Sequence, residues 1–144
     1  MKTSNYIKLE FPSKSANEAF ARTATAIFAS QLDPTLEEIN DIKTAVSEAV
    51  TNCIVHAYPN EMGIIKIKGT IKGEVIELNI SDRGKGISDI NQAVQPLFTT
   101  GGSERSGMGF TIMDSFMDKM KVRSREGKGT SVILTKRIRS RSYE

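Results

Sequence analysis

Residues that crosslink, break or anchor a chain are scarce in this sequence. Its 144 residues include one cysteine, no tryptophan and four prolines. The single cysteine, Cys53, cannot form an intramolecular disulfide and has no second cysteine with which to hold zinc. It lies in a helical pattern of apolar residues, which favours a buried structural thiol over a nucleophile. No apolar run approaches the roughly 18 residues of a membrane span, and the first residues lack the apolar core of a signal peptide. We therefore expect a cytoplasmic protein that makes no contact with a membrane.

The composition is that of one globular domain. Hydrophobic residues make up 38% of the chain and charged residues 26%, which suits one core and leaves no room for a second large domain. We therefore expect residues 1–144 to form a single domain with a short basic tail from about residue 137. The net charge is only +3, but Lys and Arg are concentrated from Lys121 onward. No aromatic interleaving or binding motif accompanies them, so we expect a solvated tail and no direct nucleic-acid binding. An acidic protein partner remains possible.

Apolar periodicity and turn residues predict the order of helices and strands. Ser15 with Glu18, and Thr35 with Glu38, have the spacing of capping boxes, so helices are expected over 15 to about 32 and 35 to about 57. A third helix is expected from 107 to about 120. Alternating apolar residues predict strands. The segment from Asp82 to Arg105 is expected to be mostly loop, with a short helix near 90–94. The strands are an opening strand over 6–11 and two hairpins, 63–71 with 74–81 and 121–125 with 130–137. Helices combined with antiparallel hairpins predict an α+β two-layer sandwich, in which helices cover one face of a sheet.

Four short motifs carry the chemistry of the chain. They are Glu48-xxx-Asn52-xxx-His56, Asp82-Arg83-Gly84-Lys85-Gly86, Gly107-Met108-Gly109-Phe110 and Gly127-Lys128-Gly129-Thr130. A carboxylate and an amide one helical turn apart can serve an attacking nucleophile and a metal ion, and glycines let backbone amides come close to phosphates. Each motif alone is weak evidence, because helices often carry a polar stripe and glycines often mark hairpins. Their joint order indicates a nucleotide site.

Together the motifs resemble the N, G1, G2 and G3 boxes of the GHKL ATPase superfamily, which includes gyrase, Hsp90, histidine kinases and MutL. The matching segments are EAVTNCIVHAY, SDRGKGI, SGMGFTIM and GKGTSVIL. The first of these, and the stretch PLFTT followed by ERSGMGFTIM, are similar to the serine kinases that act as bacterial anti-sigma factors. The resemblance covers about residues 11–136. It implies a Bergerat-type two-layer α/β sandwich with a mixed, mostly antiparallel sheet, and it implies ATP and Mg²⁺ as cofactors.

The long helix offers a base and a metal ligand on one face. Glu48, Asn52 and His56 step by four residues along a face that borders small alanines, which suits the wall of a cleft. Magnesium prefers oxygen ligands and keeps several waters, so the amide oxygen of Asn52 plus phosphate oxygens would suffice to hold it. Glu48, one turn away, could accept a proton from the attacking hydroxyl or water. The resemblance assigns the same two roles, and we expect His56 to be a hydrogen-bonded residue at the helix end.

Asp82 is the candidate for recognising the base. It follows an apolar strand and precedes Gly84 and Gly86, which allow tight turns of the backbone. Its carboxylate can accept the amino hydrogens of adenine, which the carbonyl of guanine cannot supply. The structural alternative is an Asx-type turn, which is natural for Asp before Gly. The resemblance also implies a secondary contact near the base from Thr130, although a plain hairpin explains the adjacent glycines equally well.

The third motif and the segment before it are candidates for binding the triphosphate. Gly107 and Gly109 open a helix, whose free N-terminal amides can bind phosphate. The preceding segment from Thr99 to Ser106 resembles the ATP lid of the family. Within it, Arg105 either reaches the γ-phosphate and neutralises developing charge or is simply solvated. No Walker A sequence is present, which argues against a P-loop mechanism.

These expectations leave a free-standing domain that works on other proteins. A histidine kinase would need a dimerisation helix with a phosphoacceptor histidine, but the single histidine, His56, lies inside the nucleotide motif. Relatives of gyrase, MutL and Hsp90 need a second domain, for which we expect no room in 144 residues. One hypothesis, implied by the resemblance to anti-sigma serine kinases, is a kinase that binds a sporulation sigma factor and phosphorylates a serine on its anti-anti-sigma antagonist. The other is a nucleotide-gated sigma-binding module without kinase activity, which has no need of a base at Glu48. DNA binding through the basic tail is a weaker third reading. The resemblance further implies a homodimer, and we choose Arg22 as the partner contact on the first helix.

Overall fold

A computed structural model of the chain describes residues 4–58, 61–84 and 108–139. The described strands form one five-stranded antiparallel sheet in the order β1-β2-β3-β5-β4. The elements are β1 Ser4–Pro12, α1 Ala16–Ala29, a 3₁₀ turn Ser30–Leu32, α2 Leu36–Asn52, a π-helical turn Cys53–Ala57, β2 Ile64–Lys72, β3 Val75–Asp82, α4 Met108–Phe116, β4 Lys119–Arg125 and β5 Gly129–Arg137. None of the helices in these described ranges is long and apolar enough to cross a membrane.

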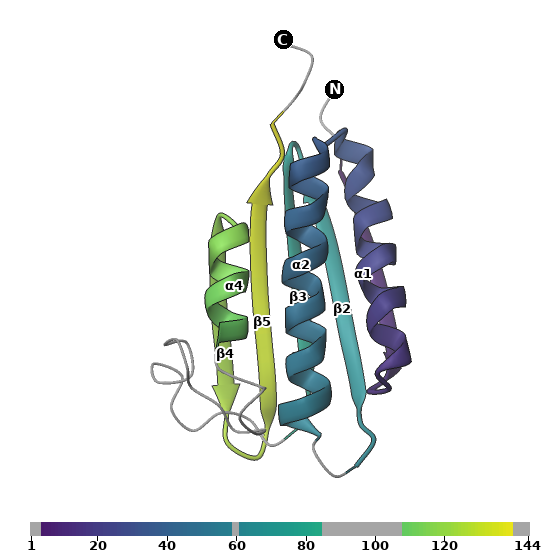
Figure 1. Cartoon of the computed structure of the whole chain (residues 1–144), viewed down its shortest axis with the longest axis vertical. Helices are drawn as coiled ribbons and strands as arrows, with labels where there is room; N and C mark the ends of the chain where they lie inside the picture. The colour runs from purple at the N-terminus through teal and green to yellow at the C-terminus, as the bar shows by residue number, and fades with distance from the viewer. Residues whose placement is uncertain (1–3, 59–60, 85–107, 140–144) are drawn as a thin grey trace.

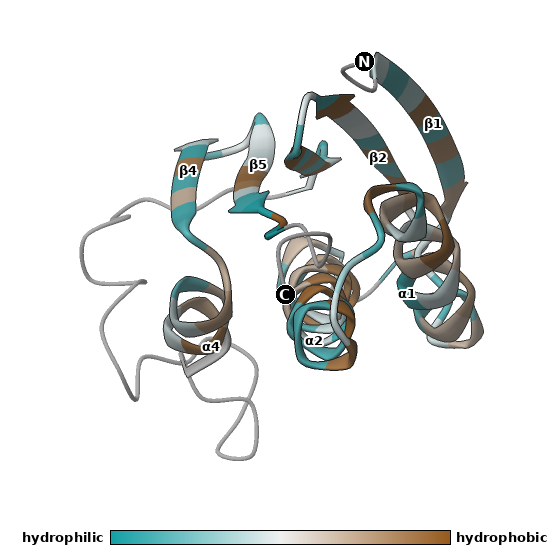
Figure 2. Ribbon diagram, turned by 90° about the horizontal axis from the view of Figure 1, so that it is seen from above, coloured by the Kyte–Doolittle hydropathy of each residue, from teal (hydrophilic) through white to brown (hydrophobic). Residues whose placement is uncertain are grey.

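The elements are arranged in two layers. Helices α1, α2 and α4 lie side by side over one face of the sheet, with α2 in the middle (Figure 1). The view along the strands shows the same separation, with the sheet in one layer and the helices in the other (Figure 2). The predicted α+β two-layer sandwich is therefore confirmed. Within the described ranges, the second face of the sheet carries no helix.

The core lies between the two layers and follows from two sequence periods. Alternate strand residues point to the helices, so Ile65 and Ile67 of β2 and Leu78 of β3 are fully buried. Residues three and four apart on α2 face the sheet, and both Ile42 and Val46 have no exposed surface. The apolar faces of the strands, which repeat every two residues, therefore pack against the apolar face of α2, which repeats about every 3.6 residues.

The two predicted helix starts have different outcomes. The Thr35 capping box is present: the Thr35 side chain accepts from the Glu38 amide at 3.1 Å, and the Glu38 carboxylate accepts from the Thr35 amide at 2.8 Å. The predicted Ser15 box is wrong, because Ser15 already has helical angles (φ −59°, ψ −30°) and its side chain makes no capping bond. The chain turns earlier there, where the Asn17 amide donates to the Lys14 carbonyl at 2.9 Å. A residue in helical conformation cannot take the extended backbone that a side-chain cap requires.

The predicted helix ends also need two corrections. The long helix reaches Ala57 as expected, but its last turn, Cys53–Ala57, is π-helical. Helix α4 stops at Phe116 instead of continuing to about 120. Lys119 and Met120, at the end of the predicted helix, pair instead with Thr135 and Leu134 of β5, so β4 begins two residues earlier than expected. Both predicted hairpins are confirmed.

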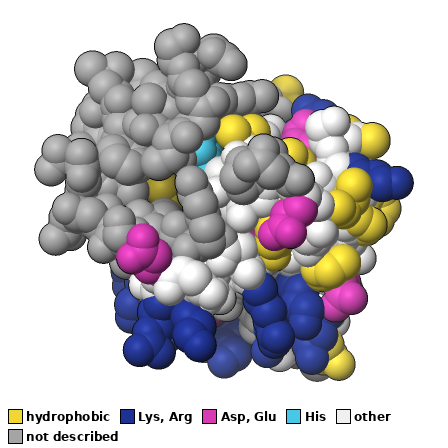
Figure 3. All heavy atoms as spheres, turned by 90° about the horizontal axis from the view of Figure 1, so that it is seen from below, with side chains coloured by type: hydrophobic (Ala, Val, Ile, Leu, Met, Phe, Trp, Pro, Cys, Tyr) yellow, Lys and Arg dark blue, Asp and Glu magenta, His cyan; other side chains and the backbone are white. Residues whose placement is uncertain are grey.

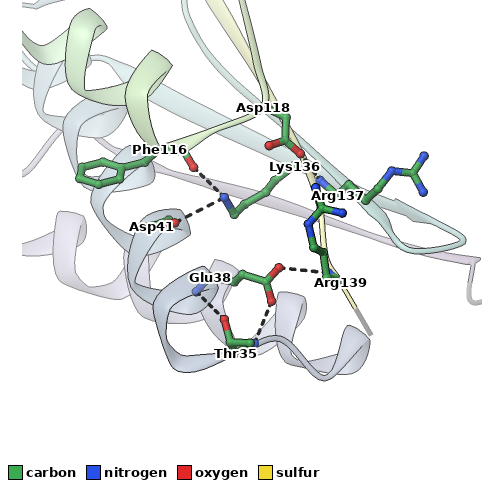
Figure 4. A network of polar contacts seen from close by, with 8 residues as sticks. All are labelled: Thr35, Glu38, Asp41, Phe116, Asp118, Lys136, Arg137 and Arg139. Atoms are coloured by element: carbon green, nitrogen blue, oxygen red, sulfur yellow. Dashed lines mark hydrogen bonds and ion pairs between the residues drawn. The ribbon is translucent and has the colours of Figure 1, made fainter. Parts of the chain in front are cut away.

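A polar network fixes the helices to the far end of β5 (Figure 4). The buried Lys136 ammonium donates to the Phe116 carbonyl of α4 at 2.8 Å and lies 3.5 Å from the Asp41 carboxylate of α2. One cation thereby satisfies an orphan carbonyl at the end of α4 and an acid on α2. Nearby, the Glu38 carboxylate accepts from the Arg139 amide at 3.0 Å. Burial raises the pKa of Glu38, but the hydrogen bonds from Arg139 and Thr35 and the charge of Lys136 outweigh it and leave this pKa lowered.

The β4–β5 turn contains two glycines with positive φ whose surroundings differ. Gly127 (φ +77°) has open space where a Cβ would lie, whereas a Cβ on Gly129 (φ +111°) would lie 2.2 Å from the Asp82 carbonyl oxygen. We predict that Gly127→Ala costs about 1 kcal/mol of unfolding free energy, from backbone strain alone. Gly129→Ala should cost ~3 kcal/mol or more, because β5 must also move away from β3. Urea unfolding measures both, and equal losses would mean that the contact with Asp82 does not constrain the turn.

Candidate functional site

Asp82 ends β3 at the place where three segments meet. In the sheet it stands opposite Ile65 of β2 and Thr130 of β5. Its Oδ1 accepts from the Gly84 amide at 2.9 Å and from the Thr130 amide at 3.2 Å. The thiol of the buried Cys53, at the end of α2, also hydrogen-bonds the Asp82 carboxylate. The carboxylate is therefore held in one orientation by its own turn, by the G3 hairpin and by α2.

Burial and hydrogen bonding shift the pKa of Asp82 in opposite directions. Burial raises the pKa of Asp82, while hydrogen bonds from the Gly84 amide, the Cys53 thiol and the Thr130 amide act to lower it. Burial also raises the pKa of the Cys53 thiol well above its usual range, and the negative charge of Asp82 adds to that shift. Cys53 is thus a buried, protonated thiol, as the sequence indicated. The Asx-type turn expected of Asp before glycine is also present, as the bond from Gly84 to Asp82.

Gly84 is required by packing against the end of α2. A Cβ at this position would lie 2.3 Å from the carbonyl oxygen of Ala57 and 2.5 Å from its Cβ. Only glycine lets the chain leaving β3 pass so close to the π-helical turn. The first glycine of the G1 motif therefore serves a close backbone approach, and within the described residues that approach is to Ala57.

Tyr58, the last residue of the EAVTNCIVHAY segment, is a site residue to which the sequence analysis gave no role. Its buried hydroxyl accepts from the Arg83 amide at 2.7 Å and donates to the Ile64 carbonyl at 3.0 Å. Its ring lies against Gly63, where a Cβ would be 2.2 Å from the ring carbons. One phenol therefore joins the end of α2 to the ends of β2 and β3. The sequence signal for this role is a tyrosine directly after a helix. If such a tyrosine is buried, its hydroxyl needs hydrogen-bond partners in neighbouring segments.

Thr130 has two partners in the hairpin. Besides its amide bond to Asp82, its hydroxyl lies 2.7 Å from that of Ser124 on β4. Ser124 also donates to the Gly129 carbonyl at 3.0 Å. These contacts place Thr130 beside the Asp82 carboxylate, and Ser124 is a supporting residue that the sequence did not reveal.

Glu48 and Asn52 lie one turn apart on α2, away from its buried stripe, and both are half-buried. The residue after Asn52, Cys53, touches Asp82, so the N and G1 motifs meet at this end of the sheet. Glu48 also lines a surface groove of about 310 Å³ together with Arg22 of α1. Arg22 forms an ion pair with Glu18 at 3.1 Å. His56 lies in the π-helical turn, whose i→i+5 pattern departs from the four-residue steps that placed it on the face of Asn52.

The phosphate-binding half of the predicted site falls largely outside the described residues. Gly86, Thr99, Arg105, Ser106 and Gly107 lie there, as does the short helix expected near 90–94. Gly109 is in the first turn of α4, which begins at Met108.

Comparisons with known proteins define the class. The family model for the histidine kinase-like ATPase domain matches residues 11–136. A crystal structure of the RsbU and RsbW domains of a Mycobacterium tuberculosis protein has the same fold, with a TM-score of 0.66 and 18% identity. That match covers 93% of this chain and 32% of that one.

Curated relatives define the group more narrowly. An anti-sigma F factor of Thermoanaerobacter sp. (strain X514) is 60% identical over 97% of this chain and 99% of its own length. Those of Caldanaerobacter subterraneus and Clostridium kluyveri are 59% and 55% identical, each over 96% of this chain and at least 97% of their own. The chain belongs to the histidine kinase-like ATPase domains and, among them, to the anti-sigma F factor family.

The raised pKa of Asp82 gives a stability test without ligand. Its folded pKa lies above its unfolded value, so the folded protein binds the proton more readily and stability falls as pH rises through the folded pKa. Asn at this position keeps an oxygen for the two amides and buries no charge. We predict that Asp82→Asn is at least as stable as the parent at about pH 7 and loses that advantage below about pH 4.

Urea unfolding at both pH values measures the effect. Asp114→Asn on the exposed surface of α4 is the matched control and should change little. If Asp82→Asn were clearly less stable at neutral pH, the charge at Asp82 would serve the fold and not a ligand.

Proposed function

We propose that this chain is a Mg-ATP-dependent serine kinase and anti-sigma factor. It would bind and inhibit a sporulation sigma factor and phosphorylate a serine on the anti-anti-sigma antagonist. The observation that carries the proposal is the fixed Asp82 carboxylate beside α2, in a chain up to 60% identical to anti-sigma F factors. A carboxylate raised in pKa by burial yet held in one orientation is typical of a binding site.

The base of ATP is assigned to the Asp82 cluster. Two backbone amides fix Oδ1, which orients the carboxylate toward a ligand without side-chain motion. The adenine amino group donates hydrogen bonds, and an acceptor-only carboxylate suits it where the carbonyl of guanine would be repelled. Thr130 and Gly84 both lie beside the Asp82 carboxylate, and Gly86 is assigned to the same base site from its motif.

The phosphates are assigned to the N-terminal side of α4. Gly109 lies in the first turn of this helix, where free amides and the helix dipole favour anions. Gly107, Ser106 and Thr99 complete the proposed cradle. Arg105 would contact the γ-phosphate, where a planar guanidinium can neutralise charge that develops during transfer.

Asn52 and Glu48 supply the metal ligand and the base. Asn52 is a half-buried amide with a carboxylate one turn away, a donor set that fits Mg²⁺, which keeps most of its waters. Bound there, Mg²⁺ would neutralise phosphate charge. Glu48 accepts the proton of the substrate serine hydroxyl while the serine oxygen bonds to the γ-phosphorus. The bond between the γ-phosphorus and the oxygen that leaves with ADP breaks in the same step.

The protein partners are assigned from the anti-sigma F family. Arg22 on α1 shares a groove with Glu48, which puts a candidate partner contact near the catalytic face. Its ion pair with Glu18 is half-exposed and weak, so a partner carboxylate can compete for the guanidinium. We further propose a homodimer located in the cytoplasm.

Substitutions on α2 separate catalysis from binding. Glu48→Gln keeps the shape of the side chain but removes the proton acceptor, so phosphorylation of the antagonist should fall about 10²–10⁴-fold. Mg-ATP binding and sigma capture should survive. Asn52→Ala should instead weaken Mg-dependent ATP binding itself. The exposed Glu37→Gln, in the first turn of the same helix, is the matched control.

Three assays on each variant separate a loss of catalysis from a loss of binding. They are ATP affinity with and without Mg²⁺, antagonist phosphorylation and sigma co-purification. Near-normal phosphorylation by Glu48→Gln would remove the base role. If the parent phosphorylated no candidate antagonist, a nucleotide-gated sigma-binding module would replace the kinase.

A further inference from the structure

The open face of the sheet contains a hollow lined by cations. The cavity has a volume of about 580 Å³ and lies at the end of the sheet near the β4–β5 turn. We call it the basic trough, defined by Lys66, Arg83, Arg123, Arg125 and Lys128 with Ser81 and Ser131 at its floor. Its volume is within the range of ligand-binding cavities.

Strand register explains the shape of the trough. Lys66 of β2 stands opposite Ser81 of β3, Ser81 opposite Ser131 of β5, and Ser131 opposite Arg123 of β4. Small hydroxyl residues therefore occupy β3 and β5, and long cations occupy β2 and β4 on either side of them. The neighbouring Ile65, Ile80 and Val132 are buried under the helices, so this row faces the opposite side. The result is a polar floor between two cationic walls.

The charge of the trough is largely uncompensated. All five cations are exposed, and among the described residues the only ion pair that any of them makes is between Lys66 and Glu10, at 3.7 Å. That pair is solvent-exposed and weak. Asp82 and Thr130 also border the trough, but the Asp82 carboxylate is already bound to the Gly84 and Thr130 amides and to the Cys53 thiol. Viewed from below, Lys and Arg side chains gather along one side of the molecule (Figure 3).

The distance between the walls limits what can dock. Strands β2 and β4 are three strand spacings apart, or about 14 Å. An α-helix is about 10–12 Å wide with its side chains, so it fits between the walls. Ile64, 45% exposed, lines one end of the trough and offers an apolar contact. A second copy of this chain does not suit the trough, because its own trough would bring the same charges face to face.

We propose that the basic trough docks an acidic helical segment of a protein partner, on the face of the sheet opposite the helices. Glu and Asp side chains of the segment would pair with Arg123 and Arg125 on one wall and Lys66 on the other. A protein is favoured over single-stranded nucleic acid because Tyr58, the one aromatic residue among the described residues that line the trough, is buried with its ring against Gly63 and offers no open face on which a base could stack. The exposed Ile64 also suits an amphipathic helix.

The test uses a labelled helical peptide of about 15 residues with Glu repeated at i and i+4 and a leucine beside them. The full chain is titrated into it without nucleotide, so the result does not depend on kinase activity. We expect saturable binding that weakens with added salt and is absent for the peptide with Gln in place of Glu. Arg123→Glu should reduce the affinity at least about 10-fold, and Arg123→Gln less. Lys14→Glu, an equal charge change at an exposed residue between β1 and α1, should leave it nearly unchanged.

Several outcomes would overturn the proposal. Absence of peptide binding at low salt would remove the docking site, and equal losses for Arg123→Glu and Lys14→Glu would show attraction to net charge only. Tighter binding of a 20-nucleotide DNA, also lost in Arg123→Glu, would make the trough a nucleic-acid surface. Far-UV circular dichroism and an unchanged ATP affinity establish that Arg123→Glu is folded and that the trough is separate from the nucleotide site.

Discussion

The hydrogen bonds to one carboxylate oxygen organise the functional end of this protein. Asp82 Oδ1 accepts from amides of its own turn and of β5, and the Cys53 thiol links the carboxylate to α2. Tyr58 adds a second tie from the helix end to β2 and β3. Because these contacts join segments far apart in sequence, the ends of α2, β3 and β5 cannot move independently. The arrangement presents a fixed acceptor at the site that we propose for the nucleotide base.

The two faces of the sheet are specialised in different ways. The covered face holds the apolar core and, at its end, the Asp82 cluster. The open face carries small hydroxyl residues between cations, a composition that suits contact with an acidic surface. At the opposite end of the sheet, the buried Lys136 holds α4 against α2. The helix that starts the proposed phosphate site is therefore fixed by its C-terminal end.

Local patterns predicted the parts of the fold that local energetics determine. The Thr35 box, both hairpins and the turn after Asp82 depend on residues within a few positions of each other. The predicted Ser15 box is absent because the chain turns one residue earlier. Helix α4 was predicted too long because Lys119 and Met120 belong to β4 and pair with β5. Tyr58, Ser124 and the basic trough result from segments brought together by the sheet. A periodicity in one segment cannot show them, and the four motifs indicated the site only because their order matched a family.

The most direct test of the account is a double-mutant cycle between Asp82 and the amino group of adenine. Calorimetry would compare ATP with purine riboside triphosphate, which lacks that amino group, on the parent and on Asp82→Asn. The account predicts that the parent prefers ATP and that the variant loses the preference, with a coupling of about 1.5–3 kcal/mol. An equal preference for ATP in both proteins would contradict it, because adenine would then be recognised elsewhere.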